Sequence, residues 1–117
     1  MAAEGGGRKI LASTKEYLEF VLEQLSELEE ISYKAMMGEF IIYYRGKIAG
    51  GIYDNRFLVK NIDSAREKMP SAALEVPYEG AKEMLLVDDV ENKAFLKELF
   101  EAMWGELPEL RKKKGKK

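Results

Sequence analysis

Three apolar segments separated by short turns constrain the fold of this chain more than any other feature. The segments at about 35–44, 47–53 and 56–60 are rich in Ile, Tyr, Phe and Val, which favour strands. The turns at 44–47 and 53–56 contain Gly, Asp and Asn, which tolerate tight-turn backbone geometry. Because such short connections force neighbouring strands to run antiparallel, the sequence predicts a three-stranded meander.

A helix is expected before this meander. Apolar residues recur every three or four positions over about 14–30, which is the pattern of an amphipathic helix with one buried stripe. Ser13 and Glu16 have the spacing of a capping box, so we expect the helix to begin there.

Two further helices are expected after the meander. Residues 63–69 are typical of a short helix that Asp63 or Ser64 caps. Asp88 and Asp89 begin a final helix in this interpretation, because negative charge suits a helix amino end. The same pair could bind Mg²⁺, but an isolated pair of carboxylates is more simply a helix cap.

Two strands lie between these helices. They are expected at 74–78 and 84–87, and Pro77 places the first at an edge of the sheet because proline cannot donate to a strand ladder. The fold class that follows is α+β, with a helix, three strands, a short helix, two strands and a helix in chain order.

Composition excludes several kinds of chemistry. The 117 residues include no His and no Cys, which excludes Ser-His-Asp and Cys-His catalysis, Cys/His zinc sites and disulfides. No cofactor or metal site is expected, and no set of residues converges on an enzyme. The amino end lacks the apolar run of a signal peptide, so we expect a flexible leader over 1–12 and a cytoplasmic location.

Charge is distributed unevenly along the chain. The net charge is −2, yet six of the last seven residues are basic and the first 110 residues carry a net charge of −8. We expect a disordered basic tail over 108–117, for which a solubilising role is the simpler reading. The nucleic-acid alternative would use the tail cations to contact phosphates. The candidate contacts are Arg111, Lys112, Lys113 and Lys114.

Three blocks of the sequence resemble the amino-terminal domain of the TfoX/Sxy family. They lie at 33–47, 51–60 and 77–90, in the order found in that family, and the resemblance covers about 14–107. It implies a secretion-chaperone-like α+β domain. Family members regulate natural competence together with the cyclic-AMP receptor protein, and they carry a second, carboxy-terminal domain. For this chain the resemblance implies a stand-alone amino-terminal domain over 13–107, acting as a non-enzymatic regulatory adaptor.

Tyrosines, methionines and turn residues supply the candidate interaction surface. Tyr and Met bury area at interfaces while remaining adaptable, and bulk on both faces of the expected sheet predicts a homodimer. The candidate surface consists of Tyr44, Gly50, Gly51, Tyr53, Asp54, Arg56 and Tyr78. Other members of the tyrosine and methionine set are Tyr33, Tyr43, Met36 and Met37, for which core and rim packing is the simpler explanation.

A small-ligand-binding module is the alternative function. Its pocket would lie near Gly50, Gly51, Tyr53 and Arg56. Adjacent glycines inside a strand allow a ligand to approach the backbone, although a bulge or close packing explains them more simply. Arg56 could hold an anion, although a surface ion pair is the simpler expectation.

Overall fold

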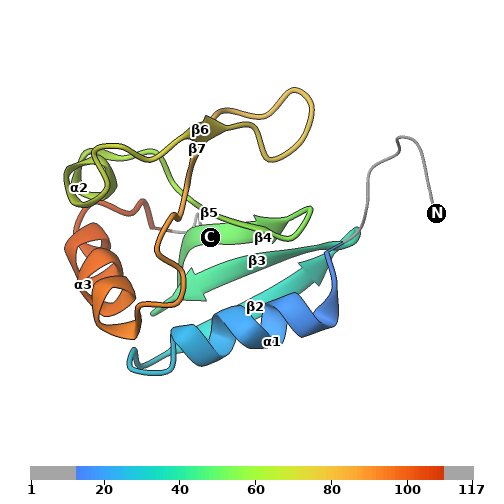
Figure 1. Cartoon of the computed structure of the whole chain (residues 1–117), viewed down its shortest axis with the longest axis horizontal. Coiled ribbons are helices and arrows are strands. Elements are labelled where there is room, and N and C mark those ends of the chain that lie inside the picture. The colour runs from blue at the N-terminus through green and yellow to red at the C-terminus, as the bar shows by residue number, and fades with distance from the viewer. Residues whose placement is uncertain (1–12, 110–117) are drawn as a thin grey trace, which may run out of the picture.

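Four consecutive strands form the larger part of the sheet in the computed structural model, which describes residues 13–109 (Figure 1). Each strand is joined to the next by a two-residue loop, and both residues of every loop have positive φ. That geometry matches the right-handed twist of the strands on either side. The strands are β2 (Ile31–Met36), β3 (Glu39–Tyr44), β4 (Lys47–Tyr53) and β5 (Arg56–Val59).

The prediction of one strand over 35–44 is wrong. Met37 and Gly38 form a turn with φ of 55° and 85°, which divides this segment between β2 and β3. The meander therefore has four strands instead of three. Met rarely adopts a positive φ, so Gly38 was the only turn signal. The turns at 45–46 and 54–55 are confirmed.

Two short strands complete a fully antiparallel sheet. They are β6 (Leu74–Glu75) and β7 (Met84–Leu86), and the strand order is β2-β3-β4-β5-β7-β6. The strand expected over 74–78 is at an edge, as its proline predicted, because β6 is the outermost strand; it ends at Glu75, before Pro77. The α+β class is likewise confirmed, with a six-stranded antiparallel sheet and three helices among the described residues.

The first helix, α1 (Lys15–Gln24), is shorter than expected and is capped by a different residue. Thr14 Oγ1 accepts a hydrogen bond of 3.1 Å from the backbone N–H of Tyr17. Ser13 instead accepts a bond of 3.0 Å from the backbone N–H of Asn55, in the β4–β5 turn. Its hydroxyl thus joins the helix start to the sheet, which spacing along the chain could not indicate.

The last helix, α3 (Lys93–Trp104), does not begin at the aspartate pair. Asn92 caps it, because its Oδ1 accepts a bond of 3.0 Å from the backbone N–H of Phe95. Asp89 Oδ2 accepts a bond of 3.0 Å from the side chain of Asn92, one step before the helix. The prediction that Asp88 and Asp89 form the cap is therefore wrong.

The middle helix, α2 (Asp63–Lys68), is capped from a distant part of the chain. Its N-cap position is Ile62, whose side chain makes no capping bond. The carboxylate of Glu106 accepts bonds from the backbone N–H groups of Asp63 (3.2 Å) and Ser64 (2.8 Å). The predicted cap by Asp63 or Ser64 is wrong, since both residues act here as backbone donors.

The helices pack on one face of the sheet, and the loop between β6 and β7 lies across the other. Figure 1 shows α1 below the strands and the 76–83 loop above them, while α2 and α3 lie side by side at one end. Strand alternation places Ile42, Ile52 and Phe57 on the helix-covered face, where all are fully buried. The helices contribute Leu18, Val21, Leu25, Leu96, Leu99, Phe100 and Met103 to this core.

Two adjacent glycines in β4 allow close packing on both faces of the sheet. A Cβ atom on Gly50 would lie 2.1 Å from the carbonyl oxygen of Leu58. One on Gly51 would lie 2.7 Å from the carbonyl oxygen of Phe40 and 2.8 Å from the ring of Tyr53. The ladder between β3 and β4 also shifts register opposite this point. Packing and a bulge therefore explain the glycine pair.

A methyl group at Gly51 should push against the Phe40 carbonyl and the Tyr53 ring, neither of which can move easily. Gly51→Ala is expected to lower the free energy of unfolding by about 1–3 kcal/mol, because backbone and a buried ring must both shift. Urea unfolding followed by circular dichroism measures this loss.

Gly105→Ala is the matched control. No heavy atom lies within 4 Å of a Cβ there and its φ is −68°, so alanine should stabilise by about 0.4–1 kcal/mol. Equal effects at the two glycines would contradict the packing argument.

The Glu106 cap should make stability depend on pH in the acid range. Hydrogen bonds from the backbone N–H of Ser64, chiefly, and of Asp63 hold the pKa of Glu106 below its usual 4.5. The resulting stabilisation is present above pH 4.5 and is lost as pH falls through the lowered pKa. Wild type should exceed Glu106→Gln in stability at pH 7, and the difference should vanish near the acid end of a urea series. Glu19→Gln, an exposed change on α1, should show no such convergence.

Candidate functional site

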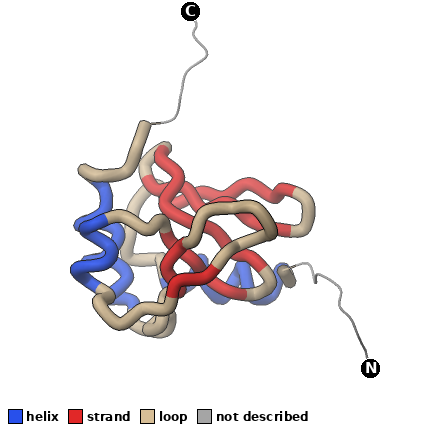
Figure 2. The backbone as a smooth tube through the Cα atoms, turned by 90° about the horizontal axis from the view of Figure 1, so that it is seen from above, coloured by secondary structure: helices blue, strands red, loops and turns tan. Residues whose placement is uncertain are grey.

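The sheet face opposite the helices is only partly covered. Ile41, Tyr43 and Ile48 alternate onto this face and are half-buried. The loop over 76–83 crosses part of the face, as Figure 2 shows from above. Side chains of this loop and of β4 and β5 therefore surround a half-buried apolar part of the sheet.

Tyr53 is the main contact between the sheet and the loop. Its ring lies over Gly51 and its centroid is 6.1 Å from that of Tyr78 in the loop. The side chain is almost fully buried, at 6% exposure. Burial, and then the nearby Glu39 carboxylate and Tyr78, raise the pKa of Tyr53 to about 12. The phenol therefore stays neutral at physiological pH.

Arg56 ties the loop to the β4–β5 hairpin. Its guanidinium donates to Glu75 Oε1 at 2.5 Å and to the backbone carbonyl of Tyr53 at 3.0 Å. Longer bonds of 3.4 Å reach the carbonyls of Val76 and Pro77. The expected ion pair is thus confirmed, and these bonds use the planar fork of an arginine. The side chain holds the loop instead of facing a ligand.

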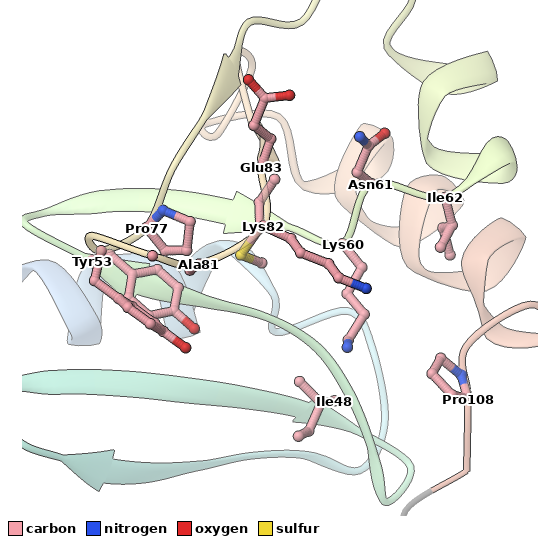
Figure 3. A pocket seen from close by; sticks show the side chains of 13 residues that line it. Ile48, Tyr53, Lys60, Asn61, Ile62, Pro77, Ala81, Lys82, Glu83 and Pro108 are labelled. Carbon is pink, nitrogen blue, oxygen red and sulfur yellow. The ribbon is translucent and has the colours of Figure 1, made fainter.

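A hollow of about 730 Å³ lies where the loop meets the ends of β5 and β7. Figure 3 shows the amines of Lys60 and Lys82 extending into the same region, while the carboxylate of Glu83 points away. Apolar atoms make up much of the remaining wall. The lining residues are Ile48, Tyr53, Lys60, Asn61, Ile62, Pro77, Tyr78, Gly80, Ala81, Lys82, Glu83, Met84 and Pro108.

The candidate surface residues from the sequence fall into two places. Gly51, Tyr53, Asp54, Arg56 and Tyr78 gather around the loop and the β4–β5 hairpin. Gly50 packs against the backbone of β5 on the helix-covered side.

Tyr44 is separated from the rest. It is 5% exposed on the helix-covered face, with its ring centroid 5.8 Å from that of Phe100 and 5.7 Å from that of Trp104. The candidate nucleic-acid contacts Arg111 to Lys114 lie outside the described residues.

Sequence reasoning did not assign Lys60 and Lys82 to this surface. They lie 22 positions apart and meet because β5 pairs with β7 after a crossover through α2 and β6. The available signal was their position, since each lysine lies beside an apolar strand that the sequence did predict. If the pairing of those two strands had been predicted, both amines would have been placed at the same end of the sheet.

The side chains at this site are suited to binding a ligand. Two ammonium groups can hold an oxyanion, and the aromatic and aliphatic wall can hold an apolar body. Within residues 13–109 no group of three or more His, Cys, Asp or Glu side chains is placed to hold a metal ion. No helix in the same span is long and apolar enough to cross a bilayer.

Comparisons with known proteins give one relative. No protein-family model matches the chain, and no solved structure is similar to it. An uncharacterised 12.7 kDa protein of the trpE 5′ region of Spirochaeta aurantia is 33% identical over 84 residues. The match spans 72% of this chain and 73% of that protein.

The arginine contacts should determine how often the loop opens. Arg56→Lys keeps the charge but cannot reproduce the forked bonds to Glu75 and the loop carbonyls. We expect amide hydrogen exchange over 76–83 to be about five- to tenfold faster, which corresponds to a loss of about 1 kcal/mol.

Arg66→Lys is the control, because Arg66 pairs with Asp63 on α2. It should leave exchange in the 76–83 loop unchanged. Unchanged exchange in both variants would show that Arg56 does not hold the loop.

Proposed function

This chain belongs to the family of the uncharacterised Spirochaeta aurantia protein, and we propose that it is a non-enzymatic interaction domain of the TfoX amino-terminal type. The three sequence blocks that resemble that domain support the proposal. So does the α+β order of a helix, a meander, a short helix, two strands and a helix. The four-stranded meander departs from the three strands that the resemblance implies.

The outer edge of β2 carries the proposal. No other strand of the described chain pairs with this edge, and Ser32 to Met36 are all exposed. Three large apolar side chains lie at or beside it: Tyr33 (44% exposed), Met36 (44%) and Met37 (95%). An exposed strand edge with apolar side chains is a template for pairing with another chain.

Met37 lowers the stability of the isolated domain. It places a flexible apolar side chain almost wholly in water, and its φ of 55° is one that Asn or Gly adopts more easily. A partner that covers the side chain would offset the exposure. The residue thus favours a role in binding over one in folding.

The opposite edge of the sheet is protected against the same contact. β6 has only two residues, and Pro77 follows shortly after it. A short strand and a nearby proline both hinder strand addition. The contrast between the edges favours β2 as the contact surface.

The partner we propose first is a second copy of this chain. Two β2 strands of six residues can pair antiparallel about a two-fold axis, and each copy would then cover the Met37 region of the other. The sheet would continue through both copies. A transcription-regulatory protein, which the resemblance implies, would then bind the dimer as an adaptor partner.

Met37→Asn tests this function because it should separate stability from association. Asparagine tolerates positive φ, so the free energy of unfolding of the monomer should rise by about 1 kcal/mol. Removing the apolar contact should weaken self-association by about tenfold or more. Sedimentation equilibrium gives the association constant, and urea unfolding of dilute protein gives the stability.

Leu74→Asn is the matched control, since Leu74 is 49% exposed on the opposite edge and should leave association unchanged. A wild-type mass that stays monomeric up to about 100 µM would overturn the homodimer. Capture of a transcription regulator from host lysate by wild type, and its loss with Met37→Asn, would support the adaptor role.

A further inference from the structure

The hollow under the 76–83 loop has the size and wall of a small-molecule site. Its volume of about 730 Å³ lies within the range of about 300–1,000 Å³ for such sites. Ile48, Met84 and Ile62 are half-buried in its wall, and Tyr53 adds a nearly buried aromatic ring. An apolar body placed against this wall would lose part of its contact with water.

Two lysines give this hollow its charge. Neither Lys60 nor Lys82 forms an ion pair with any residue of the span 13–109, whereas Lys68 and Lys93 each pair with a glutamate. Lys60 is half-buried, and its backbone N–H donates to the Ala49 carbonyl at 3.0 Å, which fixes its position beside β4. An ammonium beside an apolar wall attracts a nearby anion.

Asn61 lines the same hollow, but its amide points away from the two amines (Figure 3). Its side-chain oxygen accepts a bond of 2.5 Å from Arg66, and its backbone carbonyl accepts another of 3.1 Å. The carbonyl end of the amide is therefore occupied. The two ammonium groups therefore form the cationic part of the site on their own.

We propose that this hollow binds a small organic anion whose aromatic body packs on Tyr53, Ile48 and Met84 and whose oxyanion meets Lys60 and Lys82. Carboxylates and phosphates share the required chemistry. The site lies on the sheet face opposite the helices and does not depend on the proposed β2 contact.

An ion pair with Glu83 is the main alternative explanation for the two lysines in the hollow. Glu83 also lines the hollow and could neutralise one ammonium. Figure 3 shows its carboxylate directed away from both amines, and the two side chains make no ion pair with it. The hollow thus keeps its positive charge.

Four probes distinguish the contribution of the aromatic body from that of the oxyanion. Calorimetric titration of the full chain would use 2-naphthoate, 2-naphthyl phosphate, 2-naphthalenemethanol and inorganic phosphate. We expect one or both naphthyl anions to bind at least about tenfold more tightly than the neutral alcohol and than inorganic phosphate. The ratio of the carboxylate to the phosphate probe identifies the preferred oxyanion.

Variants show whether the site is the one described. The double variant Lys60→Met and Lys82→Met should bind the preferred naphthyl anion about tenfold more weakly, or weaker still. Lys15→Met with Lys97→Met removes the same total charge from exposed positions on α1 and α3, and should change binding by less than about twofold. If the first pair fails to fold, Lys82→Glu alone decides, since Lys82 is exposed on the loop.

Three results would overturn the proposal. These are no saturable binding of any naphthyl anion, equal binding of the neutral alcohol, and equal weakening by the two lysine pairs. Chemical-shift changes in the wild-type protein should centre on the amides of Asn61 and Ala81, which line the hollow. Changes confined to β2 would also count against it.

Discussion

The close approach of strand β4 to its neighbours at Gly50 and Gly51 is the contact on which the rest of the molecule depends. On the helix-covered side, the β5 backbone lies so close to Gly50 that a side chain there would collide with it. On the other side the close approach lets the Tyr53 ring lie flat along its own strand, where Tyr78 can pack against it. This pair of small residues therefore lets β5 lie close to β4 and leaves room for the Tyr53 ring, on which Tyr78 of the 76–83 loop packs.

The two faces and two edges of the sheet then have different roles. The helix-covered face is a closed core, and the opposite face keeps a hollow because the loop covers only part of it. Arg56 holds that loop through backbone carbonyls and Glu75, so the wall is fixed without filling the hollow. Of the edges, β2 is long and apolar while β6 is short and followed by proline. The proposed association and the proposed ligand binding therefore use separate surfaces.

Local signals in the sequence predicted the elements well, whereas contacts between distant segments could not be predicted. Gly46 and the Asp54-Asn55 pair indicated their turns because these residues tolerate positive φ, but Met37 does not and its turn was missed. The caps differ for another reason: Ser13 bonds to Asn55, and Glu106 serves α2 from the other end of the chain. Alternation put Tyr44 on one face of a strand without showing that this face was the core. Lys60 and Lys82 meet through a strand pairing that follows a crossover, so their spacing carried no signal.

The Glu106 cap makes the start of α2 depend on a residue that is synthesised 42 positions after Ser64. Residues 63–68 leave the ribosome long before residue 106, so the amino end of α2 has no capping partner while the rest of the chain is still being made. The meander has its sequence complete by residue 59 and can form first, with the closing of α2 delayed until the final turn arrives. A nascent chain halted before that point would lack the carboxylate that accepts these two backbone N–H groups, and water would have to take its place.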